Sequence, residues 1–74
     1  MKKAEIVKQK TLAETLKENL EEMRDELQEK FDEKSEKWQE SDAGDLAQEN
    51  ISCMEDAIAS LEDAIEKLEE IIER

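Results

Sequence analysis

The sequence predicts an all-α protein, an antiparallel helical hairpin of two long helices that pack like a coiled coil. Apolar residues recur at alternating spacings of three and four in both halves of the 74-residue chain, which is the heptad pattern of packed helices. There is no Pro, and the single Gly lies between the two patterns. The charged rows that border the patterns are complementary only when the two helices run in opposite directions.

Residues 1–10 form a basic N-terminal segment with four Lys against Glu5. Thr11 followed by Glu14 matches a capping box, which favours a helix start at residue 11. We therefore expect residues 1–10 to be either frayed or continuous with a helix over 11–40. Met1 is followed by two Lys but by no apolar segment, so we expect no signal peptide.

The predicted helix over 11–40 carries an apolar stripe that alternates spacings of three and four: Ala13, Leu16, Leu20, Met23 and Leu27. Phe31 and Trp38 continue it at spacings of four and seven, so the pattern predicts a stutter after Leu27. These two residues are the only aromatic side chains of the chain. They either close the turn end of the hairpin or anchor a partner protein, since Trp is enriched in binding hot spots.

A turn is expected over 41–45, where Gly44 could end the first helix in the left-handed conformation. Two caps for the following helix are open. Asp45 could cap it, with Gln48 completing a capping box. Ser41 is the alternative cap, and Gly44 would then lie inside the first helical turn.

The predicted helix over 46–73 has the clearer heptad pattern, with position a occupied by Ile51, Ile58, Ile65 and Ile72, and position d by Met54, Leu61 and Leu68. Position g is apolar and holds Ala57, Ala64 and Ile71. Position e is acidic and holds Glu55, Glu62 and Glu69. The apolar surface is therefore wider than a two-stranded contact requires.

The two stripes can be placed in register because facing residues of an antiparallel hairpin have a constant sum of residue numbers. The apolar residues pair at a sum of 81, from Ala13 with Leu68 to Leu27 with Met54. The e rows then bring basic residues against acidic ones: Lys10 with Glu69, Lys17 with Glu62, and Arg24 with Glu55. A parallel coiled coil is the alternative, because Ile at a and Leu at d favour it, but it leaves these Glu residues without basic partners.

A chain of 8.6 kDa buries little surface when it folds alone, and an elongated fold buries still less. The flank opposite the charge pairs is apolar or small, with Leu12, Ala57, Ala64 and Ile71 as its central residues. We expect a second hairpin to dock there. The predicted assembly is a homodimer that forms a four-helix bundle.

Composition points away from catalysis, cofactors and metals. There is no His, so the commonest general base and metal ligand is missing. The carboxylates fall on predicted solvent faces, and a single Cys cannot form an intramolecular disulfide. The formal net charge of −12 opposes direct binding to nucleic acid, and no apolar run approaches the ~20 residues of a membrane helix. We expect a cytoplasmic protein without catalytic or metal-binding residues.

Residues 31–68 resemble small uncharacterised acidic helical-hairpin proteins of phages and other mobile elements. The most specific part is Trp-Gln-x-Ser-x-x-Gly at Trp38, Gln39, Ser41 and Gly44. The resemblance implies a small accessory protein that acts on a host or defence protein, and it carries over no site residues. The leading hypothesis is a non-enzymatic protein that self-associates and binds a protein partner. The alternatives are a nucleic-acid mimic that inhibits a basic DNA- or RNA-binding protein, and an oligomeric sponge for a small ligand.

Overall fold

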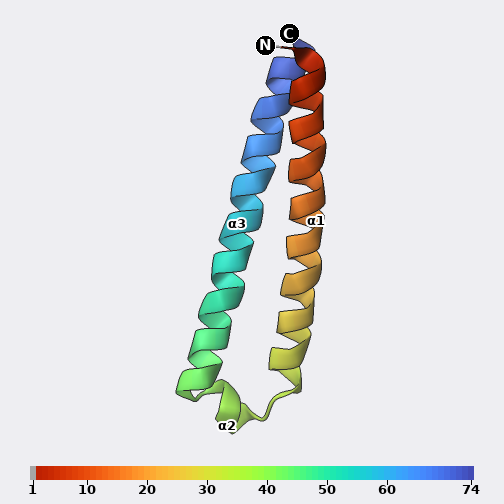
Figure 1. Cartoon of the computed structure of the whole chain (residues 1–74). Helices are drawn as coiled ribbons and strands as arrows, with labels where there is room; N and C mark the ends of the chain where they lie inside the picture. The colour runs from red at the N-terminus through yellow and green to blue at the C-terminus, as the bar shows by residue number, and fades with distance from the viewer. Residues whose placement is uncertain (1) are drawn as a thin grey trace.

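A computed structural model describes residues 2–74 and shows three helices: α1 (Lys3–Glu33), α2 (Glu36–Gln39) and α3 (Asp42–Glu73). No strand occurs within these residues, so the all-α prediction is confirmed. The long helices α1 and α3 run side by side in opposite directions, and the two ends of the chain lie together at the open end (Figure 1). The short helix α2 joins them at the closed end.

The helix α1 begins at Lys3 and continues through Thr11 without a break. Residues 3–10 therefore belong to α1, and only Met1 of the predicted basic segment lies outside the described residues. The expected capping box at Thr11 is not formed. Its hydroxyl instead donates to the carbonyl oxygen of Val7 at 3.1 Å, which is the usual bond of a Thr inside a helix.

The closed end starts earlier than the expected turn over 41–45, because α1 ends at Glu33. Ser35 is the reason, since its hydroxyl oxygen accepts from the backbone N–H of Trp38 at 3.2 Å and caps α2. The side chain of Gln39 donates to the carbonyl oxygens of Phe31 at 2.9 Å and Lys34 at 3.2 Å, and so helps to satisfy the carbonyls at the end of α1.

Ser41, and not Asp45, is the N-cap of α3, where its hydroxyl oxygen accepts from the backbone N–H of Gly44 at 3.3 Å. Gly44 lies inside the first turn of α3, and no glycine among residues 2–74 has a positive φ. Of the two caps that the sequence left open, the Ser41 alternative is therefore the one formed, and Gly44 does not end a helix in the left-handed conformation. Gly44 is needed because the backbone of Gln39 passes close to it: a Cβ at residue 44 would lie 2.2 Å from the carbonyl oxygen of Gln39.

The core of the hairpin is thin. The radius of gyration is 16.7 Å, against about 11 Å for a compact domain of this length. Among residues 2–74, the buried apolar side chains are Phe31, Ile51 and Ile58, and none of them is fully enclosed. The monomer therefore leaves much of its apolar surface in contact with water.

Helix α1 is rotated relative to the predicted register. Leu16 and Met23, assigned to the contact with α3, are 48% and 50% exposed. The residues of α1 that are half-buried include the a-position residues Ala13 and Leu20 together with the e row of Lys10, Lys17 and Arg24. Their aliphatic stems cover the seam while the charged ends reach its edge, and this displaces the d row of α1 toward solvent.

Candidate interaction surface

One side of the hairpin is closed by charge pairs between the e rows. Lys10 Nζ lies 3.1 Å from a carboxylate oxygen of Glu69, and Lys17 Nζ lies 3.5 Å from one of Glu62. Both pairs are the ones the register predicts. Exposed pairs of this kind contribute only ~0–1 kcal/mol each, so they act mainly on register and orientation.

The third predicted pair, Arg24 with Glu55, is absent. The guanidinium of Arg24 binds the neighbouring Asp25 instead, with Nη2 3.1 Å from a carboxylate oxygen. The two ribbons diverge toward the closed end, where this pair would lie (Figure 1). Glu55 is exposed and has no ion pair among residues 2–74.

The opposite side of the hairpin is apolar. Because the e rows meet on one side, the g rows and the neighbouring d positions lie on the other. The exposed apolar residues of α1 there are spaced by four, seven and four, so they form one stripe along the helix: Leu12, Leu16, Met23 and Leu27.

Helix α3 completes this surface with its d and g rows. Met54, Leu61 and Leu68 are half-buried, Ala57 and Ala64 are exposed, and Ile71 is half-buried. Leu46 is 58% exposed and precedes Ala64 by eighteen residues, about five full turns, so it points the same way. The term apolar face refers below to the residues Leu12, Leu16, Met23, Leu27, Leu46, Met54, Ala57, Leu61, Ala64, Leu68 and Ile71.

All four residues predicted for the oligomer interface belong to the apolar face, namely Leu12, Ala57, Ala64 and Ile71. Sequence reasoning missed Leu46, and it assigned Leu16, Met23 and Leu27 to the inner seam. The sequence did contain a signal for the outward position of these residues. If the aliphatic stems of the Lys and Arg residues at position e cover the seam, the d row of α1 must turn toward solvent. Val7, also exposed, lies nine residues before Leu16, about two and a half turns, and so on the other side of α1.

The aromatic residues pack together at the closed end. The rings of Phe31 and Trp38 meet edge to face, with centroids 6.1 Å apart and planes at 63°. Lys34 Nζ stands 5.2 Å from the centre of the Trp38 ring. Phe31 is only 8% exposed, so most of its side chain closes the hairpin, and the small part that stays accessible borders the pocket described next. Trp38 is half-buried, so both aromatic residues contribute to closing the hairpin, and their role as a partner anchor stays a prediction.

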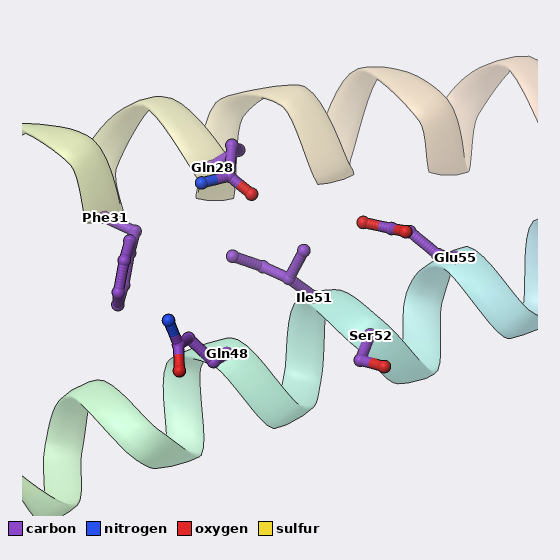
Figure 2. Close-up of a pocket in the computed structure, with 6 residues that line it drawn as sticks. All are labelled: Gln28, Phe31, Gln48, Ile51, Ser52 and Glu55. Carbon is purple, nitrogen blue, oxygen red and sulfur yellow. The ribbon is translucent and has the colours of Figure 1, made fainter. Parts of the chain in front are cut away.

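A pocket of about 310 Å³ opens between α1 and α3 beside the closed end, on the side of the e rows. Figure 2 shows its lining residues, of which Gln28 and Phe31 come from α1 and the others from α3: Gln48, Ile51, Ser52 and Glu55. A second hollow of about 300 Å³ lies nearer the open end, beside the ion pair of Lys17 with Glu62. The first pocket has an apolar floor, since Phe31 and Ile51 are both buried.

Residues 2–74 contain no group of three or more His, Cys, Asp or Glu that could hold a metal ion. Cys53 is a free, exposed thiol. Within the same residues, no helix is both long and apolar enough to cross a membrane.

The chain matches no protein-family model, no curated protein and no solved structure. The resemblance of residues 31–68 to phage and mobile-element proteins therefore stays a prediction. The hairpin thus presents two different sides, one apolar and one charged.

Proposed function

We propose that the protein is a non-enzymatic interaction protein that pairs with a second copy of itself and binds a protein partner as a four-helix bundle. The apolar face is the observation that carries this proposal. Among residues 2–74, it gathers every large exposed apolar residue except Val7 on one side. A monomer would leave this surface in water.

A second copy fits the apolar face in size and chemistry. The hairpin measures 54 Å by 14 Å, a footprint on the order of 750 Å², which is close to the ~800 Å² per partner of a standard protein interface. A two-fold axis along this face sets the same apolar rows against each other, which makes the interface self-complementary. The acidic f row of α3 stays outside the bundle, so the net charge does not oppose close contact at the interface.

The molar mass in solution tests the self-association. Size-exclusion chromatography with light scattering should give about 17 kDa for the wild type, twice the chain mass of 8.6 kDa. Leu16→Glu should give the monomer mass, because each dimer would bury two unpaired carboxylates. Val7→Glu is the matched control, since Val7 is similarly exposed on the same helix but lies off the apolar face.

Ile71→Glu is a second test, made on the other helix of the same face. Both Glu variants should keep the helical circular dichroism of the hairpin if they act only on assembly. A folded monomer for the wild type, or equal disruption by Val7→Glu, would overturn the dimer. The apolar face would then be free for a different protein.

A nucleic-acid mimic is the second candidate, and the f row of α3 favours it. Five successive f positions are acidic and exposed: Asp42, Glu49, Asp56, Asp63 and Glu70. Such a row presents regularly spaced negative charge, as a phosphate backbone does to a basic channel.

Salt distinguishes the two candidates. A mimic should displace a DNA oligonucleotide from a basic DNA-binding protein, and the displacement should weaken steeply between 50 and 200 mM salt, by about a hundredfold or more. Failure to compete at 50 mM salt would eliminate the mimic. Self-association through the apolar face should change little over the same range.

A further inference from the structure

Glu55 is the one e-row acid left without its basic partner. The e rows pair Glu69 with Lys10 and Glu62 with Lys17, but the position opposite Glu55 holds Arg24, which turns to Asp25. In Figure 2 the carboxylate of Glu55 reaches from α3 into the space between the helices. The pocket of about 310 Å³ lies in that space.

The other walls of this pocket offer hydrogen-bond acceptors around an apolar floor. The side-chain N–H of Gln28 donates to a carboxylate oxygen of Asp32 at 3.0 Å, so the amide oxygen of Gln28 is free to accept. Gln48 adds an amide, while the hydroxyl of Ser52 points away from α1 in Figure 2. Phe31 and Ile51 form the floor, and Figure 2 shows the Phe31 ring directed from α1 toward α3.

This combination fits a guanidinium better than other charged groups. A guanidinium carries five N–H donors in one plane, which suit a carboxylate together with an amide oxygen such as that of Gln28. Its planar face is weakly hydrated and packs on aromatic rings such as Phe31. An ammonium is a compact, strongly hydrated charge that uses the acceptors but gains less from the apolar floor.

We propose that this pocket receives an arginine side chain from the basic surface of a partner protein, with Glu55 as its counter-ion. The inference rests on the proposed partner binding and names the chemistry of that partner. The incoming arginine takes the place that the heptad register assigns to Arg24. Because the pocket lies on the side of the e rows, a second copy on the apolar face leaves it open.

An NMR titration tests the pocket directly. The probe is N-acetyl-arginine methylamide, and the reporters are the backbone amide signals of Gln28, Phe31, Gln48 and Ile51. We expect saturable shifts concentrated on these residues. The lysine analogue should bind more weakly, and the citrulline analogue, which has nearly the same shape without the charge, should produce no saturable shift.

Two charge-matched variants complete the test. Glu55→Gln should weaken arginine binding by about tenfold or more, because it removes the only carboxylate of the pocket. Glu66→Gln removes the same charge from an exposed residue about three turns along α3, so it should leave binding unchanged.

Shifts spread evenly over the acidic surface, or equal losses in both variants, would overturn the proposal. Equal binding of the citrulline analogue would overturn it as well. The titration is independent of assembly, since the pocket lies within one hairpin. A monomer that binds arginine would contradict the dimer alone, and a dimer without saturable binding would contradict the pocket alone.

Discussion

Gly44→Ala should destabilise the protein by up to about 2 kcal/mol, although Ala is the better helix former. The added Cβ would lie 2.2 Å from the carbonyl oxygen of Gln39 and 2.5 Å from that of Trp38. Both contacts are with backbone, so the closed end must shift to admit a methyl group. Overpacking of this kind costs about 1–3 kcal/mol, and the ~1 kcal/mol gained in helix propensity offsets only part of it.

Ala43→Gly is the matched control for this prediction, because residue 43 is exposed in the same turn of α3. Helix propensity alone predicts opposite signs, with Gly44→Ala stabilising and Ala43→Gly destabilising by ~1 kcal/mol each. The steric argument predicts that both variants lose stability. Urea denaturation followed by circular dichroism, at one protein concentration, measures both free energies of unfolding. A more stable Gly44→Ala protein would contradict the close approach at Gly44.

The pairing of the two helices could be predicted because independent patterns agree on it. The apolar stripes set a register, and the charges at Lys10, Lys17, Glu62 and Glu69 then meet in that register without having been used to choose it. Local consistency of this kind is typical of a sequence that specifies one fold. The apolar character of the flank at Ile71 followed from the same register.

The closed end could not be predicted to the same accuracy, because short side-chain contacts decide it. Ser35 and Ser41 each compete with the helix for backbone N–H groups, and heptad spacing carries no information on which Ser will do so. The role of Gly44 depends on the path of the chain through Trp38 and Gln39, which exists only after α2 has formed.

The rotation of α1 had a different cause. A heptad pattern treats positions a and d as equal, whereas the stem of a Lys or Arg at position e can cover the seam as well as a Leu at position d. The ion pair between Lys17 and Glu62 decides between them, because it requires the e rows of the two helices to lie close together. Leu16 and Met23 consequently belong to the apolar face and not to the inner seam.

Ile58→Ala should cost about 2–5 kcal/mol, the usual penalty for emptying a buried aliphatic site. Ile58 is 4% exposed, the lowest value among the apolar core residues, and the core includes only two others in the described chain. With so few buried contacts, little neighbouring structure is available to fill the space. The free energy of unfolding measured in urea should fall accordingly, and the thermal midpoint with it.

Val7→Ala is the control for this last prediction, because it also removes aliphatic atoms, but from a side chain that is 44% exposed and lies off the apolar face. It should change stability by about 0.5 kcal/mol or less. The comparison separates loss of packing in the inner seam from loss of aliphatic atoms at an exposed site, since Ile58 stabilises the hairpin itself whether or not a second copy is bound. Equal losses in the two variants would mean that Ile58 does not pack against α1, and the antiparallel pairing of α1 with α3 would then be wrong.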